Sequence, residues 1–177
     1  MHGLIFAGLR DYSVLRLGED EAEKLWEDVH FETTEAYEDE RFGAQLQRLV
    51  AATGDTPDEL LRGFGSYAAT TTFAGLFPGY YAESPDAFAF LLGIEEKIHD
   101  LVRATIPDAT PPRLHVHELR GLGVLVSYTS DRKLCRLLEG LVRGTAEYYG
   151  DEVVLEEIQC MHRGDPGCVF TVLRSAA

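Results

Sequence analysis

A histidine and a short polar array in this sequence could together form a binding site. His99 lies among mostly apolar residues on one face of a predicted helix. Further along, Tyr128, Ser130 and Arg132 alternate, so an extended chain would place them on one side at intervals of roughly 7 Å. A phenol, a hydroxyl and a guanidinium can all donate hydrogen bonds to one anionic group. An imidazole beside such an anion clamp suits haem, because the iron takes an axial ligand and the propionates need an anchor.

The element that must position His99 is a helix with recognisable ends. Ser84 is predicted as its N-cap, Pro85 fits the first helical position, and Pro107 stops the pattern. Steps of three, four, seven and eight residues from the histidine reach Val102, Glu95, Leu92 and Leu91. The polar array follows a strand-like run at 123–128, and it shares one side only if that strand continues.

Length and charge limit the class of protein. The 177 residues fit one domain with a sizeable core, and the hydrophobic and charged fractions of 45% and 26% are ordinary for a globular protein. A formal net charge of −14 opposes unaided binding to nucleic acid or to an anionic membrane. No apolar run approaches the roughly 18 residues of a membrane span, and no signal peptide is visible. Three cysteines, an odd number, favour a reducing compartment, so we expect a cytoplasmic protein.

The first half of the chain reads as helical. Amphipathic patterns predict helices over 1–17, 19–30, 45–52 and 57–67, with a charged loop over 32–41. Aromatic residues then crowd into 64–81, and such a cluster serves either as core or as the wall of a cofactor pocket. The segment 77–80 is predicted to be a turn that leads into the helix of His99.

The second half changes character after Pro112. Strands are predicted over 113–119, 123–128, 153–158 and 168–173, with one helix over 134–149 between them. Two antiparallel hairpins with a helix packed on one face make an α+β unit. We therefore expect an α+β fold in a single domain, 1–177, with a helical subregion over 1–82 and the His99 helix plus the sheet over 83–177.

These motifs resemble those of the H-NOX (haem nitric oxide/oxygen-binding) family, which includes the sensor domain of soluble guanylate cyclase. The similar residues are His99, the segment Ala109-Thr-Pro-Pro-Arg-Leu114, and Tyr128-x-Ser130-x-Arg132, which matches the YxSxR propionate signature of the family. The opening Met1–Phe6 and the closing 160–170 are similar too, so the resemblance covers nearly the whole chain. It implies the H-NOX fold, with haem b between the helical part and the sheet and His99 on the iron.

The resemblance also implies roles for the pocket residues. Pro112 matches the position whose ring presses on the porphyrin, and Ile5, Phe73 and Phe77 match the distal side. Oxygen-binding relatives place a tyrosine in the distal pocket, and the corresponding position here is Leu137. An apolar pocket favours NO and CO over O₂. Another tyrosine, at 67, 80 or 81, could still supply a hydroxyl from elsewhere.

The cysteines form a second constellation. Some bacterial relatives carry a structural zinc on three cysteines and one histidine, and Cys135, Cys160 and Cys168 match those cysteine positions. The matching histidine position holds Glu157, so either Glu157 or His162 would complete a zinc site. The alternative is a set of small buried thiols without metal.

The resemblance predicts a haem-based sensor of NO with no catalytic activity of its own. Its partner would be a separate histidine kinase or diguanylate cyclase, regulated when NO weakens the bond to His99 and the proximal helix shifts. Two alternatives remain at this point. One is a zinc/thiol redox module, and the other is a haem enzyme that acts on NO or peroxide.

Overall fold

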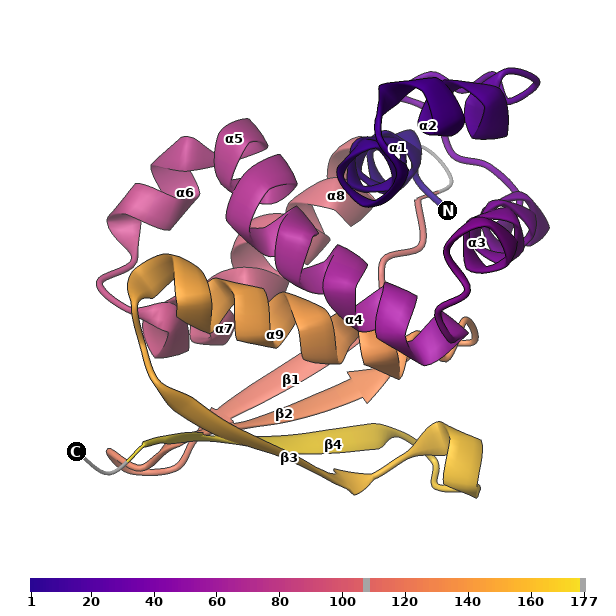
Figure 1. Ribbon diagram of the computed structural model, residues 1–177. Coiled ribbons are helices and arrows are strands. Elements are labelled where there is room, and N and C mark those ends of the chain that lie inside the picture. The colour runs from indigo at the N-terminus through magenta and orange to yellow at the C-terminus, as the bar shows by residue number, and fades with distance from the viewer. Residues whose placement is uncertain (107–108, 176–177) are drawn as a thin grey trace.

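The computed structural model describes residues 1–106 and 109–175 and has two parts that meet along helix α9 (Cys135–Tyr149). One part is a four-stranded antiparallel sheet of β1 (Arg113–Glu118), β2 (Gly123–Thr129), β3 (Val153–Gln159) and β4 (Cys168–Arg174), in the order β1-β2-β4-β3. The other part consists of the N-terminal helices, which lie above α9 in Figure 1. The predicted α+β fold is confirmed, and the four predicted strands and the helix between them agree with the structure to within one or two residues at their ends.

Alternating side chains explain why α9 covers one face of the sheet. Val124 and Val126 of β2 and Phe170 and Val172 of β4 are fully buried or nearly so, and they pack with Val142 of α9 in one core cluster. Burying apolar side chains at every second strand residue fixes the register, because a slip of one residue would expose the whole set. The sheet therefore gives α9 a rigid base.

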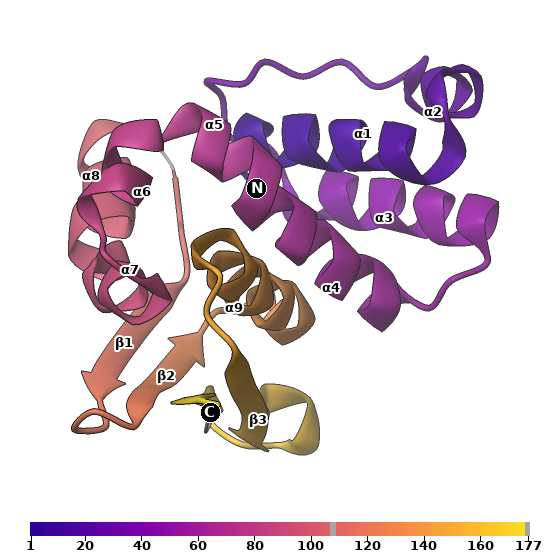
Figure 2. The same ribbon diagram turned by 60° about the vertical axis from the view of Figure 1, so that its left-hand side comes forward.

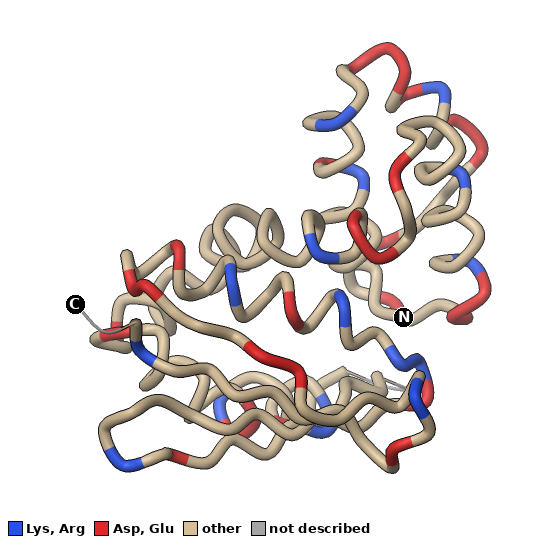
Figure 3. The backbone as a smooth tube through the Cα atoms, turned by 60° about the horizontal axis from the view of Figure 1, so that its bottom comes forward, with Lys and Arg blue, Asp and Glu red and all other residues tan. Residues whose placement is uncertain are grey.

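The N-terminal part is built from α1 (Gly3–Leu17), α2 (Glu19–Trp26), α3 (Asp39–Thr53) and α4 (Pro57–Tyr67). A second core cluster joins these helices, with Phe6, Leu9, Leu49 and Phe64 at its centre. Figure 2 shows α1 and α3 side by side, with α4 crossing between them and α9. Acidic residues gather around α2 and the loop that follows it, on the side of this part away from the sheet (Figure 3).

Glycines allow α4 and α9 to approach closely. A side-chain carbon at Gly140 would collide with the backbone oxygen of Arg62, and one at Gly65 would collide with that of Leu137. Backbone atoms cannot turn aside as a flexible side chain can, so only glycine fits at these two positions. The close crossing sets the position of Leu137 relative to the N-terminal helices.

The helix of His99 is continuous but irregular. It runs through α7 (Ala87–Ile94), the π-helical segment η2 (Glu95–His99) and α8 (Asp100–Thr105). A wider π turn rotates the residues after it relative to a regular helix, and such turns are common at functional sites. Pro107, the predicted stop, lies outside the described residues.

The predicted start of this helix is wrong. Ser84 and Pro85 precede it, and Asp86 is the N-cap, accepting a hydrogen bond of 2.8 Å from the Ala89 amide. Asp86 also pairs with Arg174 at 2.8 Å, so a contact with the distant β4 helps to select the cap. The loop predicted over 32–41 ends earlier than expected, because α3 begins at Asp39.

The aromatic segment is more helical than predicted. α4 continues through the π-helical η1 (Ala68–Phe73) and the short α5 (Ala74–Leu76), and α6 (Pro78–Glu83) replaces the predicted turn. The helical conformation is interrupted between α5 and α6 at Phe77, where φ is −124° and ψ is 46°. None of the helices in the described part of the chain is long and apolar enough to cross a bilayer.

Candidate functional site

A cavity of about 900 Å³ lies between the N-terminal helices and the sheet. Its volume is at the upper end of the range typical of ligand pockets, and its walls are mostly apolar. The walls come from α1, η1, the His99 helix, the segment 109–112, β1, β2 and α9. The residues of the sequence motifs thus surround one cavity of ligand-pocket size.

His99 lines this cavity from η2, and its tautomer follows from its hydrogen bond. The Nδ1 atom lies 2.8 Å from Oε2 of Glu95, one helical turn earlier. An ionised carboxylate can only accept, so Nδ1 carries the hydrogen and Nε2 keeps its lone pair. The Nε2 atom makes no hydrogen bond with any residue that the structure describes, and it is the atom left to bind a metal.

The charge states of His99 and Glu95 agree with this tautomer. Burial lowers the pKa of His99 below its usual range, although the hydrogen bond to Glu95 acts in the opposite direction. Burial raises the pKa of Glu95, but hydrogen bonds from His99, the Leu114 amide and Arg103 outweigh it, so the net pKa is lowered. At neutral pH the pair is therefore a neutral imidazole beside an anionic carboxylate.

The carboxylate of Glu95 is held from two further sides. The backbone amide of Leu114, at the start of β1, donates to Oε2 at 3.0 Å, and Arg103 pairs with Oε1. Arg103 also contacts the Pro112 carbonyl at 3.3 Å and Asp100 at 2.8 Å. The side chain that orients His99 is thereby tied to the sheet and to the proline segment.

Tyr128, Ser130 and Arg132 all line the cavity, but they do not lie along one strand as predicted. Strand β2 ends at Thr129, and the chain turns at once, with Lys133 at a φ of 50°. The Tyr128 hydroxyl accepts from the Leu134 amide at 3.1 Å, and Ser130 Oγ accepts from the Arg132 amide at 3.3 Å. The turn, rather than an extended strand, brings the three side chains together at the cavity.

Arg132 already has partners at the cavity wall. Its Nε donates to Asp39 at 2.7 Å, and its two terminal nitrogens donate to the carbonyl and hydroxyl of Thr110. Asp39 also pairs with the N-terminal amine of Met1 at 2.8 Å. A guanidinium has five N–H groups, so the three bonds leave two that could bind an anion in the cavity.

The remaining predicted pocket residues also line the cavity. Ile5, Phe73, Phe77 and Leu137 line the cavity, and so does Pro112. Ile5 comes from α1, Phe73 from η1 and Leu137 from α9, so three elements far apart in sequence form one apolar wall. These residues, expected in the pocket from the family resemblance, are brought together by the fold.

The tyrosine hydroxyls that could have entered this wall are engaged elsewhere. Tyr81 donates to the Ala69 carbonyl at 2.8 Å, and Tyr80 donates to the Phe90 carbonyl at 2.7 Å. Tyr67 does not line the cavity in the described structure. His2 does line it, but its Nε2 is buried without a hydrogen-bond partner and is not exposed to the cavity. Within the described residues, none of these three tyrosines therefore presents a free hydroxyl to the cavity.

The three cysteines form a second group at the N-terminal end of α9. Ligand atoms of Cys135, Cys160, Cys168 and Glu157 lie within 4.8 Å of one another, and all three thiols are buried. Burial raises the pKa of the Cys135 thiol to about 12, and the neighbouring thiols add to the shift. Thiolates are the softest protein ligands, and a compact set of three sulfur atoms and one carboxylate oxygen could hold a tetrahedral ion.

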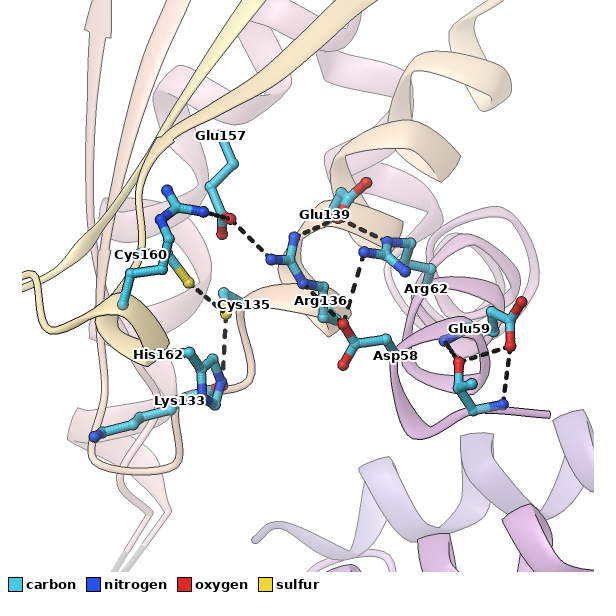
Figure 4. A network of polar contacts seen from close by, with 12 residues as sticks. Asp58, Glu59, Arg62, Lys133, Cys135, Arg136, Glu139, Glu157, Cys160 and His162 are labelled. Atoms are coloured by element: carbon cyan, nitrogen blue, oxygen red, sulfur yellow. Dashed lines mark hydrogen bonds and ion pairs between the residues drawn. The ribbon is translucent and has the colours of Figure 1, made fainter.

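Glu157, and not His162, completes this group (Figure 4). Its Oε1 is buried without a hydrogen-bond partner, while its Oε2 accepts from Arg136 at 2.8 Å and from Arg163 at 3.0 Å. His162 is exposed, and its Nε2 donates to the Lys133 carbonyl at 2.8 Å. Buried polar atoms normally have a hydrogen-bond partner or coordinate a metal, so the Oε1 atom of Glu157 is available as a ligand atom.

Sequence reasoning missed the partners of the site residues. Asp39 and Thr110 lie 93 and 22 residues from Arg132, and nothing in the sequence links them to it. Glu95 was placed on the face of His99, but its hydrogen bond was not predicted. Its spacing of four residues was the available signal, because positions i and i+4 meet on a helix.

Comparisons with known proteins found a matching family. The profile of a family described as "Haem-NO-binding" matches residues 2–157. A comparison with curated proteins found no match.

Solved structures share the fold over the whole chain. An H-NOX protein from S. oneidensis, solved in its Fe(II)NO ligation state, has a TM-score of 0.89 at 21% identity and covers 99% of this chain and 100% of its own. The same protein in the Fe(II)CO state, solved by NMR, has a TM-score of 0.88 at 21% identity, with both chains covered completely. An unliganded Fe(II) H-NOX mutant from K. algicida has a TM-score of 0.80 at 26% identity and covers 99% of this chain and 97% of its own.

Proposed function

Since this chain belongs to the haem-NO-binding family, we propose that it is a haem-based gas sensor that binds NO and CO, excludes O₂ and regulates a partner signalling protein. The observation that carries the proposal is His99, whose Nε2 lone pair is free in the wall of a 900 Å³ apolar cavity. A haem held there would supply a ferrous iron that binds diatomic gases. The relatives solved with NO and CO support the choice of ligands.

The residues present fit a haem b. His99 would bind the iron, and the two unused N–H groups of Arg132, with Tyr128 and Ser130, would hold a propionate. Pro112 would press on one face of the ring, while Ile5, Phe73, Phe77 and Leu137 would cover the other. The whole chain would act as one domain, with 1–82 as the helical distal subregion and 83–177 as the subregion of the proximal helix and the sheet.

The signal would leave through the proximal helix. If NO weakened a bond from His99 to a bound haem, the helix would lose its attachment to the haem, and only contacts such as that of Glu95 with the Leu114 amide of β1 would then hold it in place. A partner that binds two positions of the helix with different affinity would read a shift between them, as any population switch requires. We place that partner among histidine kinases and diguanylate cyclases. The sensor itself would have no catalytic activity and would work in the cytoplasm, where its three thiols stay reduced.

Exclusion of O₂ rests on Leu137 and is directly testable. Bound O₂ draws electrons from iron and is stabilised by a hydrogen-bond donor, whereas NO needs none. We expect the reduced protein to show no stable spectral change from O₂ in air, and the Leu137→Tyr variant to acquire one. Leu137→Phe introduces a side chain of nearly the same size as tyrosine but without the hydroxyl, so this variant should behave like the unchanged protein. A stable O₂ spectrum of the unchanged protein would refute the assignment.

The cysteine group supports a second proposal, a structural zinc on Cys135, Cys160, Cys168 and Glu157. The buried and unpartnered Oε1 of Glu157 is the specific observation. Arg136 and Arg163 would balance two of the four ligand charges, and oxidation of the thiols would release the ion. The site would then add a redox input to the sensor.

Elemental analysis of protein purified with reductant should find one zinc per chain. The Glu157→Ala variant should bind zinc more weakly, by at least the roughly 10–100-fold that loss of an outer-shell group costs. His162→Ala is the matched control and should bind zinc normally, because His162 lies outside the group. Freshly reduced protein without zinc would remove the site.

A further inference from the structure

The contact between Glu95 and His99 is more than a local helix bond. Its two atoms lie 2.8 Å apart, and the His99 side chain is only 15% exposed, so water competes little for the imidazole hydrogen. A carboxylate that accepts this hydrogen increases the electron density on the other ring nitrogen. That nitrogen, Nε2, is the one that faces the cavity.

We propose that Glu95 is a positioning residue that strengthens the bond between His99 and the haem iron, and that the Glu95–Arg103 pair thereby sets how readily NO breaks that bond. The inference rests on the proposed function, since it requires haem on His99. It concerns the strength of the bond, whereas the proposed function concerns only its existence.

The surroundings of Glu95 keep its oxygen aimed at His99. The Leu114 amide donates to the same Oε2 that accepts from His99, at 3.0 Å, and it belongs to a backbone held in β1. Arg103 binds the opposite oxygen, Oε1. A carboxylate fixed from both ends cannot rotate away, so the imidazole ring is held in one orientation.

Arg103 opposes the effect of Glu95 on His99. Its positive charge draws the carboxylate electrons away from His99, so it weakens the effect of Glu95 on the ring. Replacing Glu95 and replacing Arg103 should therefore change the iron–histidine bond in opposite directions. Damage to the fold alone would weaken the bond in both variants.

The test is the iron–histidine stretching frequency of the reduced protein, measured by resonance Raman spectroscopy. It should fall in Glu95→Gln, which is nearly isosteric but neutral, and fall further in Glu95→Leu. It should rise in Arg103→Met. Glu96→Gln is the matched control, because Glu96 lies next to Glu95 in η2 but is exposed, and its frequency should be unchanged.

The response to NO should follow the same order. Under NO, some of the protein loses the bond between His99 and the iron and the rest keeps it. In Glu95→Leu the ratio of the first form to the second should rise by roughly tenfold, which corresponds to about 1.4 kcal/mol. Equal frequencies in all the variants would overturn the inference, and so would a fall in both Glu95→Gln and Arg103→Met. Unchanged protein that takes up no haem would refute the proposed function, and this inference with it.

Discussion

The His99→Gly variant should hold its partner in the NO-bound regulatory state whether or not NO is present. Glycine removes the imidazole while it leaves Glu95 bonded to the Leu114 amide and to Arg103. The proximal helix then has no bond to the iron, which is the condition that NO is proposed to create. Partner activity with and without NO is the measurement, and the difference between the two should disappear.

Two controls separate this effect from damage to the helix. Glycine within a helix costs about 1 kcal/mol, so thermal unfolding should show a modest loss of stability. Free imidazole added to the variant should enter the space left by the side chain, restore an iron ligand and change the absorption spectrum. His115→Ala, on the exposed side of β1, should respond to NO as the unchanged protein does. A glycine variant whose partner still responds normally to NO would contradict the proposed signalling route.

Loss of the anion clamp should have the second large effect. Arg132→Leu removes the guanidinium, whose side chain is only 18% exposed, together with its bonds to Asp39 and Thr110. A hydrogen bond to a charged group contributes roughly 1.5–3 kcal/mol. Haem should therefore leave the variant about 10–100 times faster, as measured by its transfer to an excess of an apoprotein acceptor.

Neighbouring substitutions test whether the charge or the geometry matters. Arg132→Lys keeps the charge but loses the planar fork, so its haem should leave at an intermediate rate. Lys133→Gln removes an exposed positive charge at the next position and should leave the rate unchanged. If Arg132→Leu retained haem as well as the unchanged protein does, the propionate would have to be held elsewhere.

The two variants change different lining residues of the cavity, and the structure links their surroundings through the segment 110–112. Arg103 contacts the Pro112 carbonyl on the side of His99, and Arg132 contacts Thr110 two residues earlier. A shift of the proximal helix would therefore pull on the same segment that anchors the clamp. This short stretch is where we expect the helical part and the sheet to exchange the signal.

Much of the fold could be predicted from local patterns. Apolar alternation located the four strands to within one or two residues, because burial on one face fixes the period of a strand. Helical periodicity placed His99 on an apolar face, and the spacing to Tyr128, Ser130 and Arg132 indicated a cofactor. These features depend on residues that are close in sequence.

The sequence alone could not decide which groups surround those residues. The cap of the His99 helix is Asp86 instead of Ser84, and its carboxylate also meets Arg174, 88 residues away. Glu157 instead of His162 joins the cysteines, because the sheet turns one side chain inward and leaves the other on an exposed turn.

The contrast is clearest around His99 itself. Helical periodicity placed the imidazole on a mostly apolar face, and the resemblance to the H-NOX motifs predicted that it would line a haem pocket. Only the tertiary structure determined that Glu95 would be held against it by the Leu114 amide and Arg103. Hydrogen bonds of this kind depend on backbone groups brought together by folding, and no pattern of neighbouring residues encodes them.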